Sequence, residues 1–242
     1  MENLAPNNKR IVKNTLLLYV RMLFLMVVSL YTSRVVLNAL GIEDFGIYNV
    51  VGGMVAMFSM LSGSLSAAIT RFITYELGRG DREKLRTIFS SAVTIQLGLA
   101  AIIIILAEVL GIWFLNSKMT IPLDRLAAAN WVFQFSVLTF AINLVSVPYN
   151  ASIIAHERMS AFAYISIFEA VGKLAIAYLI TISPIDRLVF YAILMCAVAL
   201  IVRFTYGIYC KRHFEECMYH FIFDKNLLKD MFGFAGWNFI GA

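Results

Sequence analysis

Charged side chains inside long apolar stretches are the residues of this sequence best placed to do chemistry. Arg21, Glu169 and Lys173 lie well within such stretches, and Arg71 lies near the end of another. A charge within a bilayer costs about 2.5–3.5 kcal/mol on insertion scales, so such residues usually face a bundle interior or a water-filled cavity. The apolar stretches hold five basic and two acidic side chains. This excess predicts a site for an anionic group such as a pyrophosphate, which arginine and lysine bind well.

Each of these charges also has an interpretation that needs no ligand. Glu169 and Lys173 have the i, i+4 spacing and order that favour an ion pair, so they form either a neutralised structural pair or a binding or coupling site. Arg21 shares a narrow helical stripe with Asn14 and Thr32, which indicates a polar face directed at a cavity. Four charged residues lie near the ends of apolar stretches, where the side chain can extend to the lipid headgroups instead of facing a cavity. They are Arg34, Arg71, Glu108 and Arg203.

Small and hydroxyl-bearing residues gather on one face of the second apolar stretch. Gly52, Ser59, Gly63 and Ser66 fall on this face if the stretch is one regular helix, and Asn143 lies on a broader polar stripe of the fourth stretch. Small residues let membrane helices approach closely, so close packing is one explanation. We expect that these residues also line a solvated cavity.

The overall composition requires a bilayer around these residues. The chain is 61% hydrophobic and 14% charged, with a mean hydropathy of +0.80, which leaves too little polar surface for a soluble domain. A spanning helix needs about 20 apolar residues. The sequence therefore predicts an all-α, polytopic transmembrane helical bundle of six spans plus a truncated seventh, which begins near Met231 and is cut at Ala242. The six predicted spans are about 14–37, 47–74, 88–115, 127–152, 160–182 and 188–210.

The distribution of basic residues predicts the orientation. The N-terminus and the second, fourth and sixth loops hold twelve Lys and Arg residues, whereas the intervening loops hold three. Because short cytoplasmic loops carry the excess of positive charge, the N-terminus is expected on the cytoplasmic side of the membrane. The pI near 9.1 then reflects topology and contact with anionic lipid headgroups, and gives no reason to invoke nucleic acid.

The sequence offers no place for soluble-enzyme chemistry. None of the nucleotide-binding, nucleophile-elbow or zinc-protease motifs occurs, and we expect neither enzymatic activity nor a cofactor. Cys210, His213, Cys217 and His220 are zinc-like in type, but on a helix the ends of this pattern would lie about 15 Å apart, too far for one ion. We therefore predict no metal site. A coupling ion, either a proton or sodium, is left open.

A short internal sequence repeat predicts a second lobe. The segments that begin at Lys9 and Lys225 share Lys-x3-Lys followed by a polar residue and then an apolar stretch, with six stretches between them. Transporters built from parallel repeats show this kind of arrangement. We expect residues 1–223 to form an N-terminal six-helix lobe and residues 224–242 to begin a second lobe that is truncated here.

Two segments carry a resemblance to a known family. They run from Ser33 to Asp81 ("SRVVLNALGIEDFGIYNVVGG…YELGRGD") and from Val147 to Leu174 ("VPYNASIIAHERMSAFAYISIFEAVGKL"). The chain resembles the polysaccharide-export, or Wzx-like oligosaccharide (O-antigen) flippase, family of the multidrug/oligosaccharidyl-lipid/polysaccharide (MOP) exporter superfamily. The resemblance covers a MATE-like N-terminal lobe.

The resemblance implies a flippase that moves a lipid-pyrophosphate-linked oligosaccharide from the cytoplasmic to the periplasmic leaflet by alternating access. It implies membrane lipids and other polysaccharide assembly proteins as further partners, with lipopolysaccharide O-antigen as one candidate product. Two alternatives stay open at this point. One is a cation-coupled multidrug exporter of the same superfamily, which is expected to place acidic groups centrally. The other is a non-transporting scaffold for polysaccharide assembly.

Overall fold

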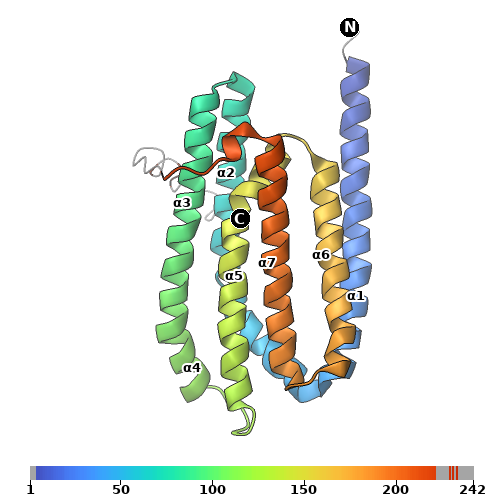
Figure 1. The fold of residues 1–242 in the computed structure, drawn as a ribbon, viewed down its shortest axis with the longest axis vertical. Coiled ribbons are helices and arrows are strands. Elements are labelled where there is room, and N and C mark those ends of the chain that lie inside the picture. The colour runs from blue at the N-terminus through green and yellow to red at the C-terminus, as the bar shows by residue number, and fades with distance from the viewer. Residues whose placement is uncertain (1–3, 222–228, 230, 232, 234–242) are drawn as a thin grey trace.

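The structure of this chain is a computed structural model that describes residues 4–221, 229, 231 and 233. Over these residues it is all-helical, and long helices run side by side between two ends (Figure 1). The helices are α1 (Leu4–Ala56), α2 (Ser59–Arg79), α3 (Arg82–Leu106), η1, a π-helix (Ala107–Gly111), α4 (Ile112–Ser117), α5 (Leu126–Ala155), α6 (Met159–Leu179), η2 (Ile180–Ile182), α7 (Arg187–His213) and η3 (Glu215–Cys217).

Five helical ranges within the described residues are long and apolar enough to cross a membrane. Four of them correspond to the third to sixth predicted spans, because each apolar run ends at a polar loop that also ends the helix. The fifth range includes the first predicted span and continues past it. The ranges are Asn14–Ala56, Arg82–Ser117, Leu126–Ala155, Met159–Ile182 and Arg187–His213.

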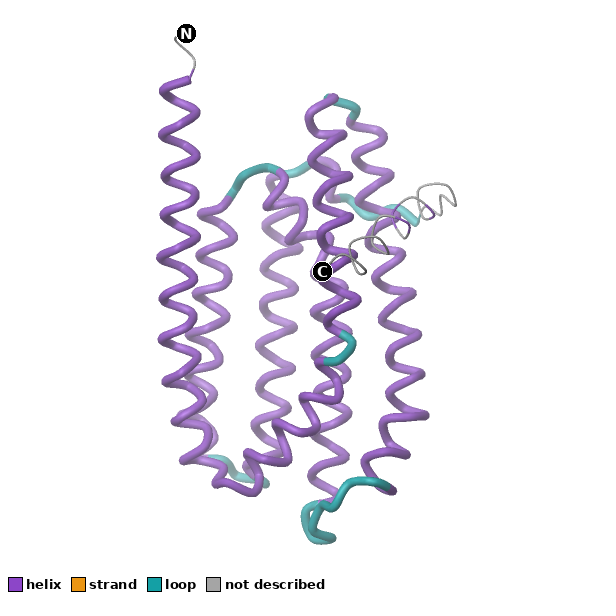
Figure 2. The backbone as a smooth tube through the Cα atoms, turned by 180° about the vertical axis from the view of Figure 1, so that it is seen from behind, coloured by secondary structure: helices purple, strands orange, loops and turns teal. Residues whose placement is uncertain are grey.

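The second predicted span, 47–74, is not one continuous helix, which corrects the expectation. The backbone turns at Gly41, whose φ of 82° and ψ of 172° suit glycine alone. The last part of α1 then returns towards the N-terminal end, and α2 completes the path (Figure 2). A break at Met57 and Phe58 separates the two, with the N–H of Phe58 bonded to the carbonyl of Val55 in a tighter turn.

The centre of the bundle is α5, which packs against α7, α2, α3 and α1. Helix α1 also packs against α6, and its long first part runs beside that helix (Figure 1). The outward surface is apolar: Leu16, Tyr19, Leu23 and Leu30 on α1 are all more than half exposed. In a bilayer, lipid chains surround such side chains, so their exposure is the expected state for a spanning helix.

The expected second lobe falls mainly outside the described residues. Only 229, 231 and 233 of the range 224–242 are described, so the predicted seventh span and the domain boundary stay predictions. Met231 is fully buried in a cluster that includes Ile73 of α2 and Leu85 of α3.

Candidate functional site

A cavity of about 470 Å³ lies between the two parts of α1, α6 and α7. We call it the charged pocket. Three of the predicted site residues line it together: Arg21 from α1, and Glu169 and Lys173 from α6. The other lining residues are Leu25, Val28, Ser29, Thr32, Ser33, Val36, Phe45, Tyr48, Asn49, Ser166, Ala170, Tyr191 and Met195. Arg21 and Thr32 thus share a cavity, as their common stripe predicts, whereas Asn14 is not among the lining residues.

Arg21 is held by an aromatic ring. Its guanidinium carbon lies 4.2 Å from the centroid of the Phe162 ring, a cation–π contact that stabilises the charge without neutralising it. Its Nε is buried and has no hydrogen-bond partner among the described residues. A buried donor of this kind is costly unless water or a ligand satisfies it, so Arg21 is equipped to bind an anion.

Glu169 and Lys173 form the predicted ion pair. The Lys173 ammonium donates a hydrogen bond of 2.6 Å to Glu169 Oε1. With Arg21, the charged lining of the pocket consists of two cations and one carboxylate. The net charge is positive, and one cation remains after the pair has neutralised itself.

A second cavity of about 250 Å³ adjoins the first. We call it the neutral pocket because no charged residue lines it in the described part of the chain. Three of the predicted cavity-lining residues are here: Gly52, Ser59 and Asn143. The remaining lining residues are Tyr48, Val55, Ala56, Ser136, Thr139, Phe140, Ala192 and Met195.

Three predicted site residues do not line either pocket. Gly63, Ser66 and Arg71 all lie on α2, and neither cavity includes them. The predicted stripe assumed one regular helix through the second span, whereas the break at Met57 and Phe58 interrupts the register after Ala56. Arg71 is exposed on α2 and has an interaction partner of its own.

Comparisons with known proteins agree with the membrane character of these helices. The family described as "Polysaccharide biosynthesis protein" matches residues 11–242. This chain belongs to that family. The uncharacterized membrane protein EpsK of Bacillus subtilis (strain 168) is a relative, 22% identical over 124 residues. The alignment covers 51% of this chain and 24% of the relative, so it spans about a quarter of the relative's length. No solved structure matches.

An ionic cluster lies at the end of the bundle opposite the N-terminus, and the sequence analysis did not predict it. Arg125, just before α5, pairs with Asp44 of α1 and Asp186 before α7. The pKa of Arg125 is raised above its ordinary value, and the hydrogen bond with Asp44 is the largest cause. Burial alone would raise the pKa of Asp186, but the backbone N–H of Val189 and the Arg125 guanidinium outweigh it, and that pKa is lowered. The cluster joins the segment of α1 just after the turn at Gly41 to the beginnings of α5 and α7.

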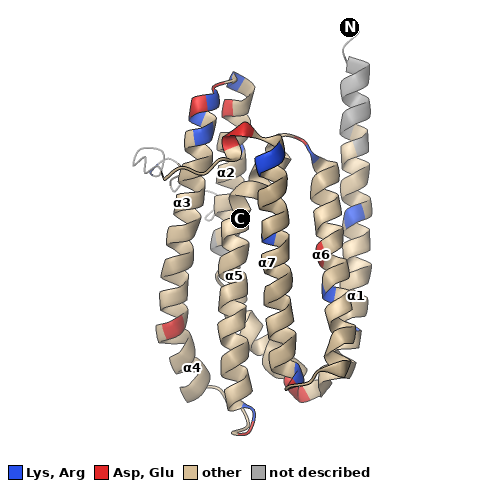
Figure 3. Ribbon diagram, in the orientation of Figure 1, with Lys and Arg blue, Asp and Glu red and all other residues tan. Residues whose placement is uncertain are grey.

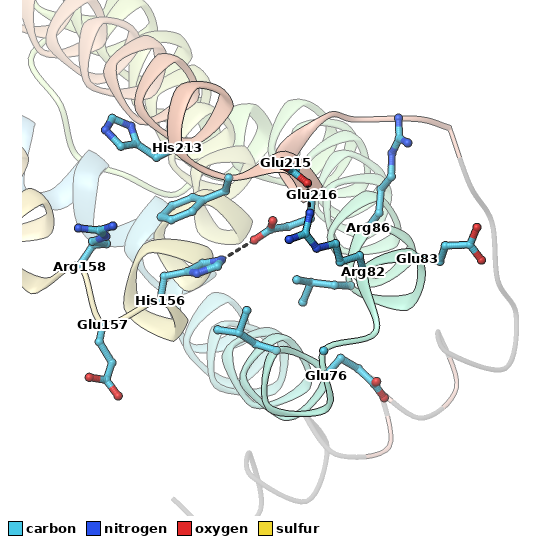
Figure 4. Close-up of a pocket in the computed structure, with 14 residues that line it drawn as sticks. Glu76, Arg82, Glu83, Arg86, His156, Glu157, Arg158, His213, Glu215 and Glu216 are labelled. Atoms are coloured by element: carbon cyan, nitrogen blue, oxygen red, sulfur yellow. Dashed lines mark hydrogen bonds and ion pairs between the residues drawn. The ribbon is translucent and has the colours of Figure 1, made fainter. Parts of the chain in front are cut away.

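At the N-terminal end, a larger cavity of about 790 Å³ lies among α2, α3, the α5–α6 loop and η3 (Figure 4). The imidazole of His156 pairs with the nearly buried carboxylate of Glu216 and stacks on Phe214 with ring centroids 4.0 Å apart. The exposed Arg82 pairs with Glu215. These contacts attach η3 to the ends of α5 and α3.

The electrostatics of this second cluster differ from those of the charged pocket. Five glutamates line the cavity together with three arginines and two histidines, so its lining is not basic overall. Burial would raise the pKa of Glu216, but the hydrogen bond and charge of His156, a backbone hydrogen bond and the charge of Arg82 lower it below its ordinary value. The cavity is therefore a poorer candidate for binding an anionic group than the charged pocket.

Proposed function

We propose that this chain is the N-terminal lobe of a flippase that moves a lipid-pyrophosphate-linked oligosaccharide from the cytoplasmic to the periplasmic leaflet. The protein would act as a transporter by alternating access between two lobes and not as an enzyme. Its place would be the bacterial inner membrane, with the N-terminus in the cytoplasm. Its cargo would serve surface polysaccharide synthesis, O-antigen being one candidate.

The charged pocket is the observation that carries this proposal. It brings Arg21 and Lys173 together inside apolar helices, and among the described residues Glu169 is the one carboxylate that lines it. A guanidinium presents several donors in a planar fork that fits phosphate oxygens. In the proposed mechanism, Arg21 attracts the pyrophosphate first. Lys173 follows when it exchanges Glu169 for the phosphate, and Arg71 on α2 assists at a distance from the pocket.

The same pocket favours an anionic cargo over the drug-exporter alternative. A site for organic cations needs a carboxylate available to the ligand, but Glu169 already accepts a hydrogen bond from Lys173. The guanidinium of Arg21 would in addition repel a cation. Scaffold function needs no such lining, whereas this lining combines a buried, unsatisfied Arg21 donor with a cavity.

The arrangement of charges supports the proposed orientation. Acidic and basic side chains gather at the two ends of the bundle, with a few in the middle of α1, α6 and α7 (Figure 3). The Arg-rich start of α3 and the Lys211-Arg212 end of α7 lie at the same end as the N-terminus. Basic residues at one end are expected to face the cytoplasm.

The proposal is tested in the full-length protein by changing Arg21 and a matched arginine on the same helix. Arg34 lies on α1 but does not line the charged pocket. In a deletion strain, Arg21→Gln should fail to restore surface polysaccharide and should accumulate lipid-linked glycan in the cytoplasmic leaflet, whereas Arg34→Gln should complement. Both proteins must be present at wild-type levels in the membrane. Normal export by Arg21→Gln at that level would refute the role of Arg21 in binding.

A further inference from the structure

The charged and neutral pockets share a wall. Tyr48 from the last part of α1 and Met195 from α7 line both cavities. The Tyr48 ring is fixed edge-on against Tyr191, with centroids 4.7 Å apart and planes at 62°. The volumes of the two cavities together fall within the range of about 300–1,000 Å³ that is usual for ligand sites. The two pockets therefore adjoin at one aromatic residue, and their lining differs in charge.

The neutral pocket offers mainly hydrogen-bond acceptors from hydroxyl groups. Ser59 donates its hydroxyl proton to the carbonyl of Ala56 at 2.6 Å. Thr139 donates to the carbonyl of Phe135 at 2.7 Å. Each hydroxyl oxygen keeps its lone pairs and can still accept a hydrogen bond.

Two further polar side chains of the pocket are without a partner among the described residues. These are Ser136 and Asn143, both on α5 and both in the lining. The Asn143 amide offers two donors and one acceptor. Polar groups at membrane depth need water or a ligand to satisfy them. The neutral pocket thus matches a ligand that carries many hydroxyl groups and no charge.

We propose that the neutral pocket binds the first sugar of the cargo while the charged pocket binds the pyrophosphate, with Tyr48 at the junction between them. This inference rests on the proposed function and adds a substrate class to it. Sugar rings present C–H faces that pack on aromatic rings, and Tyr48 adds a hydroxyl group that can hydrogen-bond to the sugar. Asn143 and Ser136 reach the sugar hydroxyls from α5.

The uncharged lining of the neutral pocket predicts which first sugars it can bind. A first sugar with a carboxylate, such as a uronic acid, would place a negative charge where the lining supplies no cation within the described residues. Burying such an unpaired charge is costly. The site is therefore expected to prefer a neutral first sugar and to reject a uronic acid at that position.

Binding of three probes to the purified full-length protein tests the inference. The probes are a short-chain polyprenyl pyrophosphate, the same lipid carrying one N-acetylhexosamine, and the same lipid carrying one uronic acid. The wild type should bind the neutral-sugar probe about tenfold more tightly than the sugar-free probe, the gain of one or two hydrogen bonds. The uronic acid probe should show no such gain.

Variants separate this inference from the proposed function. Asn143→Leu, which changes a residue of the neutral pocket alone, should lose the gain from the sugar and keep the affinity for the sugar-free probe. Tyr48→Leu should also lose the gain, whereas Tyr48→Phe should keep most of it. Thr74→Leu, an exposed hydroxyl on α2 outside both pockets, serves as the control for the change to leucine. Arg21→Gln should weaken binding of all three probes.

The outcomes decide between the two proposals. If Arg21→Gln weakens all probes but the wild type gains nothing from the neutral sugar, the neutral pocket is not a sugar site and the proposed function stands. If the uronic acid probe gains as much affinity as the neutral-sugar probe, the assigned selectivity is wrong and the proposed function still stands. If the wild type binds none of the probes, the proposed function fails and this inference fails with it.

Discussion

The ammonium of Lys173 lies 2.6 Å from Glu169 Oε1 on a part of α6 that lines the charged pocket. The carboxylate therefore competes with any phosphate that Lys173 would bind. Glu169→Gln removes this competition and leaves Lys173 with an uncommitted charge. We expect this change to tighten binding of a short-chain polyprenyl pyrophosphate by about tenfold, because a hydrogen bond to a charged group contributes about 1.5–3 kcal/mol. Isothermal titration of the full-length protein measures it.

Lys173→Gln provides the matched comparison, since it should weaken the same binding. The prediction is that the two substitutions change the affinity in opposite directions. If the two substitutions change affinity equally and in the same direction, the pair has a purely structural role.

The pairing of Arg125 with Asp44 and Asp186 predicts a stability effect at the other end of the bundle. Arg125→Ala leaves the Asp44 carboxylate, which is 8% exposed, without its guanidinium partner. We expect a loss of about 1–3 kcal/mol, below the full cost of breaking a buried pair because Asp186 is partly exposed. The thermal midpoint in detergent should fall by several degrees. Arg125→Lys should lie in between, because an ammonium lacks the fork geometry.

Lys118→Ala is the control, since it removes an exposed cation from the loop that precedes α5. It should change the midpoint little. A loss for Arg125→Ala no larger than that of the control would show that the cluster does not hold α1, α5 and α7 together at this end.

Much of the fold was predictable because it is determined locally. The predicted spans 127–152, 160–182 and 188–210 correspond to helices at 126–155, 159–182 and 187–213, since long apolar runs bounded by polar residues define both ends. The turn at Gly41 and the break after Ala56 were not predicted. Hydropathy averages over a window and carries no information on the backbone angles of single residues.

The candidate site also contains some features that the sequence predicts and others that depend on tertiary packing. The Glu169–Lys173 ion pair was predicted from the sequence, because the two residues have i, i+4 spacing on one helix. The partners Arg125 and Asp44 are 81 positions apart, so only the packing of α1 against α5 brings them together. The neutral pocket combines both cases. Asn143 and Ser59 were expected at a cavity, but the role of Tyr48 as a wall between two pockets depends on tertiary packing.

The pairing of Glu216 with His156 predicts a pH-dependent contribution to stability. Glu216 has a pKa below its ordinary value, despite burial that would raise it, because His156, a backbone hydrogen bond and Arg82 stabilise the carboxylate. A lowered pKa means that the contribution is complete above the unfolded-state value of about 4.3 and is lost as the pH falls through the folded-state pKa. Glu216→Gln should therefore lower the thermal midpoint at pH 7 by several degrees, and the difference from wild type should shrink towards pH 3.5.

Glu215→Gln is the matched control for this measurement. Its pair with Arg82 is 80% exposed on both sides, so it should contribute little at any pH. A constant difference between Glu216→Gln and wild type across the pH range would contradict the role assigned to the carboxylate.

Close packing of Gly111 against Phe133 predicts a steric effect in the third span. A Cβ added to Gly111, at the end of the π-helix η1, would overlap Cζ of the Phe133 ring, which is 2% exposed. Gly111→Ala should therefore cost about 1–3 kcal/mol through overpacking. Gly98→Ala on α3, where nothing lies within 4 Å of the added Cβ, should be neutral or slightly stabilising. Thermal unfolding of both variants in detergent compares them directly.

A double variant identifies the cause of the expected loss. Phe133→Leu removes the ring atoms that the new methyl group would meet, at the cost of a cavity in the core. Gly111→Ala should then be less harmful in the Phe133→Leu background than in the wild type, because the clash is gone. If the effect of Gly111→Ala is the same in both backgrounds, the glycine is required by the π-helical backbone and not by the neighbouring ring.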